Sequence, residues 1–432
     1  MEKYPIMRVN YHDPLEYIRG LQQLLISDKK KIAFLFGAGT SLAKKNNESK
    51  NVPAIGKLTL EIETEILKSL DSIGSPIPGA YIQLKDEIGK EKYTIESLLS
   101  LLEIKRSVVG KSSLNGLTEA QFTILINQIK DKIRKKISIH QEVEKKTENL
   151  IHVDFADWIK KADRKFAIEI FTTNYDYLFE IGLENKNVPY YDGFTGGYKP
   201  FFNAESVDDI NFLPHQTKLW KMHGSLGWHF DDKTKKVWRK DSDSDDMLIY
   251  PSTLKYNDSK KQPYTALGDR LTNFLKQPDT ILITCGYSLG DEHINERILT
   301  ALSSNTTAHV YVLFYDILYE DGKKNGYTLT EDSYLSQLAK SNNKLSVFGC
   351  KSAVIGCKYG EWRLKREPDK DDTLNVNLYF DESFSPNPDD KIKVESKESV
   401  LWSGEGELFL PDFKKFVEFL QSMIFESNST KE

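Results

Sequence analysis

The stretch from Lys31 to Ser41, KIAFLFGAGTS, constrains the fold of this chain more than any other. Its apolar run Ile32 to Phe36 has the length of a buried strand, and the chain then turns through two glycines. Residues without a bulky Cβ let backbone N–H groups approach an anion at such a turn. A full GxGxxG dinucleotide motif is absent, because Leu42 occupies the position three after Gly39. The stretch predicts a parallel α/β sheet and leaves open whether the turn binds a phosphate or only connects two elements.

Composition limits the class of protein. The chain has 432 residues, which exceeds one typical domain, and it is 39% hydrophobic and 28% charged. It can therefore bury a core and keep a polar surface. The net charge of -5 argues against a dedicated DNA-wrapping surface. A basic cluster over residues 130–136 is compatible with nucleic acid contact, but a solvated helix face explains it more simply.

Membrane, secretion and metal signals are absent from the sequence. No run approaches the ~18 apolar residues that span a bilayer. The first residues, MEKYPIMRVNYHD, lack the apolar core of a signal peptide, so we expect a cytoplasmic protein. Cys285, Cys350 and Cys357 are the only cysteines and form no CxxC pair. We therefore expect neither a structural zinc site nor a disulfide framework, and we predict no metal ligand set.

Hydrophobic periodicity predicts the order of the elements. Residues 94–158 are helical almost throughout, residues 73–79 form a break that contains two prolines, and residues 228–250 have the pattern of an inserted hairpin. The predicted helices otherwise cover 14–27, 58–70, 177–183, 267–275 and 411–425, and the predicted strands cover 32–36, 166–171, 219–222, 280–285, 309–314, 345–348 and 354–357.

These elements predict an α/β fold with a helical subdomain, about residues 80–160, inserted between the first and second core strands. Beyond Tyr315 polar stretches alternate with short strands, so we expect an appended region over 316–432. It ends in an amphipathic helix over 411–425. The apolar face of that helix packs on its own domain or on a partner, and the first explanation is favoured.

Polar motifs follow the predicted strands where each strand ends. GAGTS follows the first strand, TTNYD the second and GYSLGD the third, and KMHGS lies at a fourth edge. In this order and spacing the motifs resemble the sirtuin family, whose NAD-binding fold has a GAG turn, a TQN-x-D loop, an HG pair with a catalytic His, and a late G-x-S loop. The matching residues are Gly37, Ala38, Gly39, Asn174, Asp176, His223, Gly224, Gly286 and Ser288.

The resemblance covers about residues 32 to 312. It implies a Rossmann-like parallel sheet of sirtuin type over residues 1–315, with NAD as the bound molecule and substrate. The sequence departs from the deacetylase branch of the family. Val52 to Ile55 replace a GIPDFR-like segment, Thr173 replaces the glutamine of the TQN loop, and the four-cysteine zinc module after the HG pair is missing, so no zinc is expected.

The chemistry of NAD cleavage indicates which residues act. Nicotinamide carries a positive ring nitrogen and leaves without a general acid, so the site has to stabilise an oxocarbenium-like ribose and position a nucleophile. We expect His223 to orient or deprotonate water or a ribose hydroxyl, and Asn174 to hold that group beneath the anomeric carbon. The resemblance implies the binding residues: Asp176 for the nicotinamide carboxamide, Gly37, Ala38, Gly39, Thr40 and Ser41 for the diphosphate, and Gly286, Ser288 and Asp291 for the adenosine ribose.

Structural roles remain open for the same residues. A His before a Gly is more often structural than catalytic. Asn174 is placed where it can cap the helix that follows it, and Asp291 where it can cap a helix that starts at Glu292. The joint occurrence of four motifs favours catalysis for His223 and Asn174, and leaves Asp291 undecided.

Without the zinc module and the GIPDFR-like segment, the sequence resembles the bacterial sirtuin-like NADases of antiphage defence. The stretches GYSLGDEHIN and PDFKKFVEFL look like segments of the short proteins that assemble with HerA-type ATPases. The expected activity is therefore NAD+ hydrolysis to nicotinamide and ADP-ribose as an abortive-infection effector. We expect a homo-oligomer with a possible hexameric HerA-type partner, no membrane, and nucleic acid only through that partner. The alternatives are an NAD-dependent deacylase or ADP-ribosyltransferase, and an NAD- or ADP-ribose-sensing scaffold without turnover.

Overall fold

A mixed sheet of ten strands forms the centre of the protein. The computed structural model describes residues 10–69, 76–162, 164–231, 233–240, 247–249, 262–381 and 403–424. The strand order is β1-β17-β16-β15-β12-β11-β2-β3-β7-β4, and the strands from β15 to β4 are parallel. Their bounds are β1 (Tyr11–His12), β2 (Lys31–Phe36), β3 (Glu169–Thr172), β4 (Tyr190–Tyr191), β7 (Thr217–Lys221), β11 (Thr280–Cys285), β12 (His309–Leu313), β15 (Leu345–Phe348), β16 (Ser352–Ile355) and β17 (Lys358–Trp362).

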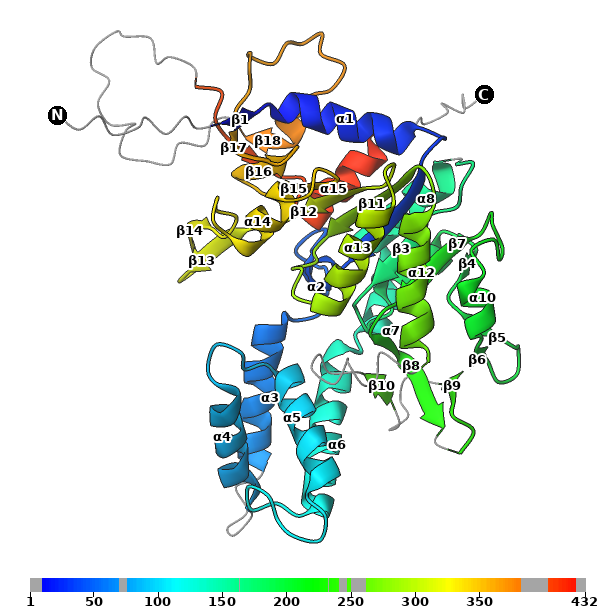
Figure 1. Ribbon diagram of the computed structural model, residues 1–432, viewed down its shortest axis with the longest axis vertical. Helices are drawn as coiled ribbons and strands as arrows, with labels where there is room; N and C mark the ends of the chain where they lie inside the picture. The colour runs from blue at the N-terminus through cyan, green and yellow to red at the C-terminus, as the bar shows by residue number, and fades with distance from the viewer. Residues whose placement is uncertain are drawn as a thin grey trace, which may run out of the picture.

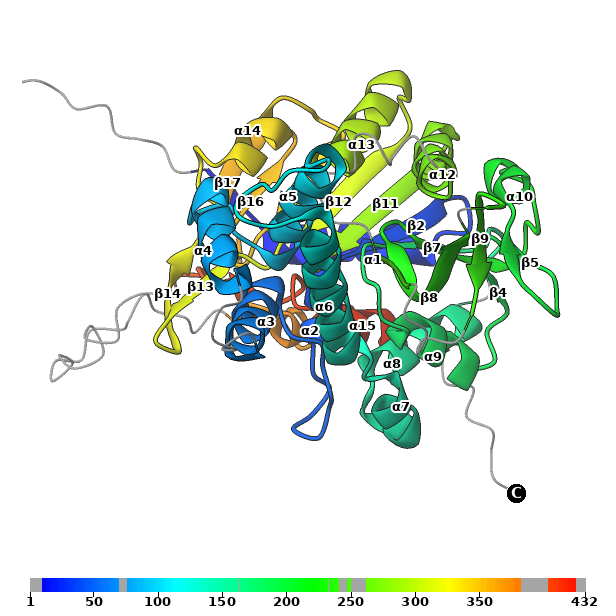
Figure 2. The same cartoon turned by 90° about the horizontal axis from the view of Figure 1, so that it is seen from below.

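Helices cover both faces of this sheet, which gives the predicted α/β architecture. One face packs under α1 (Pro14–Ile26), α8 (Ile151–Lys161), α9 (Leu178–Asn185) and α15 (Phe413–Gln421). The other packs under α10 (Ala204–Asp208), α12 (Tyr264–Lys276), α13 (Glu292–Ser304) and α14 (Tyr334–Lys340). Figure 2 shows the two helical layers with the sheet between them. The sheet is buried on both sides, which explains why β2, β3 and β11 are continuous apolar runs with few polar residues.

A helical bundle is inserted between β2 and β3, where the sequence predicts a helical insertion over about residues 80–160. The bundle itself starts earlier, at Ile55, and α8 packs on the sheet instead. The bundle consists of α3 (Ile55–Ser69), α4 (Ile77–Ile88), α5 (Ile95–Val108) and α6 (Glu119–Ile137), and it has a core of its own. In Figure 1 it extends below α2 (Ala38–Leu42), at the edge of the sheet where β2 ends. The short helices α7 (His140–Val143) and η1 (Glu144–Asn149) lead from the bundle to α8. The break predicted over 73–79 is wrong from Ile77 onward, because Pro78 lies in the first turn of α4, where proline is tolerated.

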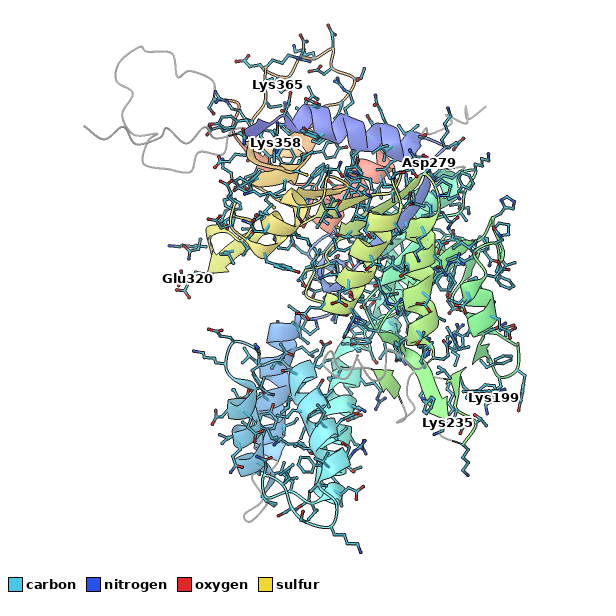
Figure 3. The ribbon with its side chains drawn as sticks, viewed as in Figure 1. Lys199, Lys235, Asp279, Glu320, Lys358 and Lys365 are labelled. Carbon is cyan, nitrogen blue, oxygen red and sulfur yellow. The ribbon has the colours of Figure 1, made fainter. Side chains whose placement is uncertain are left out.

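A smaller antiparallel sheet lies beside β7. Its order is β10-β8-β9-β6-β5, with β5 (Phe194–Thr195), β6 (Phe201–Phe202), β8 (Gly224–Asp231), β9 (Lys236–Arg239) and β10 (Met247–Ile249). The pair β8 and β9 confirms the predicted hairpin, whose residues 232, 241–246 and 250 lie outside the described residues. Figure 3 shows Lys199 and Lys235 at the outer end of this sheet.

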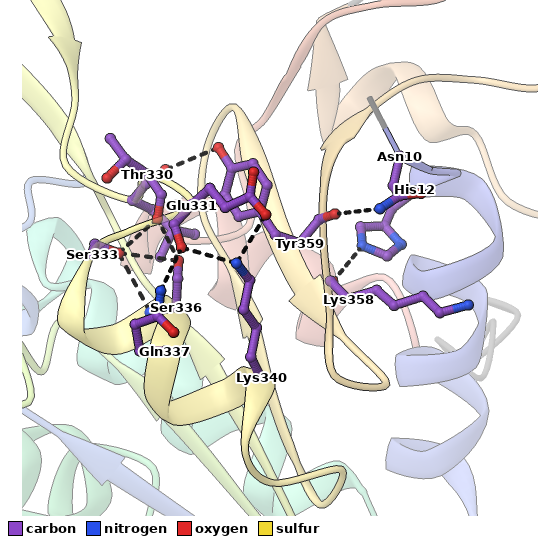
Figure 4. A network of polar contacts seen from close by, with 11 residues as sticks. Asn10, His12, Thr330, Glu331, Ser333, Ser336, Gln337, Lys340, Lys358 and Tyr359 are labelled. Atoms are coloured by element: carbon purple, nitrogen blue, oxygen red, sulfur yellow. Dashed lines mark hydrogen bonds and ion pairs between the residues drawn. The ribbon is translucent and has the colours of Figure 1, made fainter. Parts of the chain in front are cut away.

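The chain after residue 315 adds to the same sheet. The antiparallel strands β16 and β17 follow β15, and β1 from the other end of the chain pairs with β17. Around this edge His12 Nε2 lies 3.1 Å from the carbonyl oxygen of Lys358, and Asn10 donates to the carbonyl of Tyr359 (Figure 4). The region also contains β13 (Ile317–Glu320), β14 (Lys323–Tyr327), η2 (Val376–Leu378), β18 (Phe380–Asp381) and β19 (Glu407–Leu408). The domain boundary expected near residue 315 stays a prediction.

The C-terminal helix α15 packs on its own chain. The Phe413 ring lies 5.4 Å from the Phe36 ring, and the Phe416 ring lies 6.0 Å from the Phe34 ring. Its apolar face therefore helps to bury the central strand β2, which confirms the favoured explanation. None of the helices in the described ranges combines the length and apolar character that a bilayer crossing requires.

Candidate functional site

The glycine turn after β2 lies directly against the end of β11. The two strands are paired in register, Cys285 opposite Phe36, so their next residues meet. A Cβ on Gly37 would lie 2.5 Å from the carbonyl oxygen of Gly286, and a Cβ on Gly39 would lie 2.6 Å from the Gly286 Cα. The Gly39 N–H donates to that carbonyl over 2.9 Å. This approach of two backbones explains why the turn is built from glycine.

Asn174 holds this turn from the neighbouring strand end. Its amide nitrogen Nδ2 lies 3.0 Å from the Gly37 carbonyl oxygen, 3.0 Å from Thr40 Oγ1 and 2.8 Å from Ser41 Oγ. The carbonyl acceptor identifies this atom as the nitrogen, because an amide oxygen there would repel it. Among the described residues, no hydrogen bond reaches the Asn174 Oδ1 atom. The side chain therefore keeps an acceptor at the point where β3 ends.

Asp176 completes the same buried network. One carboxylate oxygen accepts from Ser41 Oγ over 2.6 Å, and the other accepts from the Leu178 N–H over 3.1 Å, at the start of α9. Asp176 lies one residue before the N-cap Tyr177 and binds the first N–H of α9, whereas Asn174 donates to the glycine turn, so the cap proposed for Asn174 is wrong. The contact between Asp176 and a nicotinamide carboxamide stays a prediction.

Lys221 is a residue at this edge that sequence reasoning missed. It ends β7, is 2% exposed, and donates to the backbone carbonyl of Asp176. Its ammonium also pairs with the Glu180 carboxylate over 2.9 Å. Burial raises the pKa of Glu180, and the Lys221 charge opposes that shift. A lysine two residues before the HG pair was the available signal, but its partners are distant in sequence.

His223 follows β7 and is held by Asp291. Its Nε2 lies 2.8 Å from Asp291 Oδ2, with the side chains 14% and 7% exposed. The other oxygen of Asp291 accepts from the N–H groups of His293 and Ile294, at 3.1 and 3.3 Å. Asp291 therefore caps α13, which begins at Glu292, and this confirms the structural role left open above. The same residue orients the His223 ring.

The predicted residues thus form two groups at the carboxyl ends of β2, β3, β7 and β11. The first group joins the glycine turn, Asn174, Asp176 and Gly286, and the second joins His223 to Asp291. Ser288 and Ala38 are exposed near them. In the residues that the structure describes, no hydrogen bond joins Ser288 to either group. Its role in binding the adenosine ribose stays a prediction.

The basic cluster on α6 lies outside this site and is fully matched by carboxylates. Lys130 pairs with Glu103, Lys132 with Glu65, and Lys136 with both Glu61 and Glu65. Arg134 and Lys135 pair with Asp131. These pairs favour the solvated helix face over nucleic acid contact.

A cavity of about 260 Å³ lies between the loop after α2 and the α7–η1 segment. Its walls include Glu48, Lys50, Glu142 and Lys146, and none of the predicted site residues lines it. Lys50 pairs with Glu142 over 3.0 Å. In the described ranges, no group of three or more His, Cys, Asp or Glu side chains is arranged to hold a metal ion.

Residues 168–345 match the family model of the SIR2-like domain. The SIR2-like region runs from the residue before β3 to the start of β15, so it contains Asn174, Asp176, His223, Gly286 and Asp291. A search of curated proteins returned no match. The sheet, its helices and this match together support a sirtuin-like, Rossmann-like fold.

The glycine turn precedes the SIR2-like region in sequence but belongs to it in space. Gly37 and Gly39 touch Gly286, and Ser41 touches both Asn174 and Asp176. SIR2-like domains bind NAD, and the match indicates an NAD-related activity. The binding of a diphosphate by this turn stays a prediction.

Proposed function

We propose that the protein is an NAD+ glycohydrolase, which cleaves NAD+ to nicotinamide and ADP-ribose. The observation that carries the proposal is the pair His223 and Asp291, held at the same sheet edge as the Asn174-bound glycine turn. A His oriented by a carboxylate beside a phosphate-compatible turn suits the activation of water at a ribose. The SIR2-like match supports NAD as the substrate.

The reaction follows from what each group can do. The bond between the ribose C1′ and the nicotinamide nitrogen breaks, and its electron pair neutralises the charge of the pyridinium ring. Water attacks C1′ and loses a proton. When His223 donates its Nε2–H to Asp291, the neutral ring carries its lone pair on Nδ1, which is the atom that accepts this proton. Asn174 Oδ1 accepts from the water or a ribose hydroxyl and fixes its direction.

The biological setting is part of the proposal. We propose a cytoplasmic NAD-depleting effector of antiphage defence that acts as a homo-oligomer with a HerA-type ATPase. The support is the resemblance of the GYSLGDEHIN and PDFKKFVEFL stretches. Because the apolar face of α15 is buried on its own chain, a partner would meet the polar face that carries Lys414 and Glu418.

Incubation of the purified protein with NAD+ tests the activity directly. Nicotinamide and ADP-ribose are separated by chromatography, with the protein alone and with any ATPase encoded beside it. His223→Ala should lower the rate at least about 100-fold, since general base catalysis contributes that much or more. Asn174→Ala should also lower the rate, because it removes the acceptor that directs the water. His215→Ala is the matched control, because His215 is exposed on the loop before β7.

Four outcomes separate the candidate functions. Product release that disappears in the two variants and persists in the control supports the hydrolase. An unchanged rate in His223→Ala contradicts the assigned mechanism. Intact NAD+ that stays bound after long incubation favours the sensing scaffold, and a mass increase on an acceptor peptide favours a transferase.

A further inference from the structure

The TTNYD segment connects two parts of the molecule because its side chains alternate. Asn174 and Asp176 face the glycine turn and contact Gly37 and Ser41. The intervening Tyr175, and Tyr177 after it, pack against the core of the helical bundle. One short segment thus has the glycine turn on one side and the inserted bundle on the other.

Tyr175 makes a polar contact between the site and the bundle. Its hydroxyl donates to Glu96 Oε1 over 3.3 Å, and Glu96 lies in the first turn of α5. Its ring centre lies 6.4 Å from that of His223, and its carbonyl accepts from the Leu226 N–H over 3.1 Å. Burial, reinforced by the Glu96 charge, raises the pKa of Tyr175 well above its ordinary value. The phenol therefore stays protonated and acts as the donor.

We propose that Glu96, supplied by the helical bundle, is a positioning residue for the site and acts through the Tyr175 hydroxyl on Asn174 and His223. This inference rests on the proposed function, because it assigns Glu96 a part in NAD+ cleavage. It also gives the bundle a role, because a shift of α5 changes the position of Tyr175.

The physical basis is the location of one hydrogen bond. At 3.3 Å the bond is longer than the ~2.5–2.7 Å of a strong hydroxyl–carboxylate bond, so Glu96 acts by fixing the position of the Tyr175 ring and not by the strength of the bond. Tyr175 follows Asn174 in the chain. A displacement of the Tyr175 ring therefore also moves the backbone that carries the Asn174 side chain. The backbone contact to Leu226 passes the same displacement to β8, which begins next to His223.

A double-mutant cycle tests the inference. Tyr175→Phe removes only the hydroxyl, and Glu96→Ala removes its acceptor. Each should lower kcat/KM for NAD+ about tenfold, and the double variant should lose no more than either alone, because both remove one interaction. Glu96→Gln should keep at least half of the wild-type value, since its amide oxygen still accepts from Tyr175.

Two matched variants control for damage to the bundle. Glu103→Gln removes a carboxylate from the same helix, where it pairs with Lys130, and Tyr93→Phe removes a bundle hydroxyl that lies 2.7 Å from that of Tyr81. Both should leave kcat/KM unchanged. Losses as large as those of the Tyr175 and Glu96 variants would overturn the inference.

The affinity for ADP-ribose, measured by calorimetry, separates this inference from the proposed function. If the wild type cleaves NAD+ and the Glu96 and Tyr175 losses multiply, the inference is wrong and the function stands. If the wild type does not cleave NAD+ but the cycle is non-additive in the Kd of ADP-ribose, the hydrolase proposal is wrong and the positioning role stands. If the wild type neither cleaves NAD+ nor binds ADP-ribose, both the hydrolase proposal and the positioning role are wrong.

Discussion

Asp291 shows how one residue can serve the fold and the site together. One oxygen accepts the two N–H groups that begin α13, and the other holds His223 Nε2. The cap fixes the carboxylate in place, because the first N–H groups of a helix have no partner within the helix. The direction of the His223 ring is therefore set by the start of α13, a helix that lies far along the chain.

Asp291→Asn should separate these two roles. Asparagine caps as well as aspartate, so the free energy of unfolding should change by less than about 1 kcal/mol. With its oxygen on the cap, the new amide turns its NH₂ toward His223, which forces the lone pair onto Nε2 and the proton onto Nδ1. We expect kcat to fall at least about tenfold at unchanged stability, measured by product release and by urea unfolding.

Asp412→Asn is the control for that substitution, because Asp412 caps α15 by accepting from the Lys415 N–H. It should leave kcat unchanged. A wild-type rate in Asp291→Asn would contradict the assigned tautomer of His223.

At the scale of elements, the register of β2 and β11 creates the site. Because both strands end at the same level, the residue after each meets the other backbone. Gly286 has a φ of +63, and a Cβ there would lie 2.6 Å from the Thr40 nitrogen. The position therefore excludes a side chain by conformation and by space.

Gly286→Ala should lower stability and ligand binding together. A left-handed φ costs a residue with a side chain about 1–2 kcal/mol, and the clash adds about 1–3 kcal/mol. Gly110, with a φ of +58 and open space around its Cβ position, isolates the first cost. We expect Gly110→Ala to lose only about 1–2 kcal/mol in urea unfolding and to bind ADP-ribose normally. Equal effects of the two substitutions would argue against the close approach.

At the scale of the whole molecule, the C-terminal helix closes the core behind the site. His152 of α8 lies beneath it, with ring centres 5.2 Å from Phe413 and 4.5 Å from Phe179. The side chain is 2% exposed, and neither ring nitrogen has a hydrogen-bond partner in the described residues. Burial lowers the pKa of His152 to about 4. The folded protein therefore holds this histidine neutral.

That burial predicts a loss of stability in acid. In the unfolded chain His152 binds a proton below about pH 6.5, whereas in the folded chain it does so only below about pH 4. Stability is therefore full above pH 6.5 and falls as the pH drops toward 4, by about 2 kcal/mol at pH 5 from this residue. Urea unfolding at pH 8 and pH 5 measures the difference.

His152→Phe should remove the loss of stability that His152 causes between pH 8 and pH 5. The aromatic neighbours can pack against a phenyl ring, and a phenyl ring does not titrate. His215→Phe, at an exposed position, should retain it. A His152→Phe protein with the wild-type pH dependence would show that another group carries the loss. His309, whose pKa burial also lowers to about 4, is the next candidate.

The architecture follows from local patterns to a large extent. The apolar runs predict β2, β11, β12 and β15 within about a residue and β7 within two, and helical spacing predicts α1, α3, α9 and α12. The second core strand is an exception, because it is predicted to start at Phe166, whereas β3 starts at Glu169. The start of α4 was missed because two prolines signal a break in sequence, while one of them fits a helical first turn.

Local patterns are enough to predict a largely parallel sheet with polar motifs at its strand ends, because strand length, glycine turns and helical spacing depend on neighbouring residues. The three-dimensional packing set how those motifs combine. It placed Gly286 against the glycine turn, Asp291 on His223 and Glu96 on Tyr175, since strand register and the docking of the bundle bring together residues that are distant along the chain.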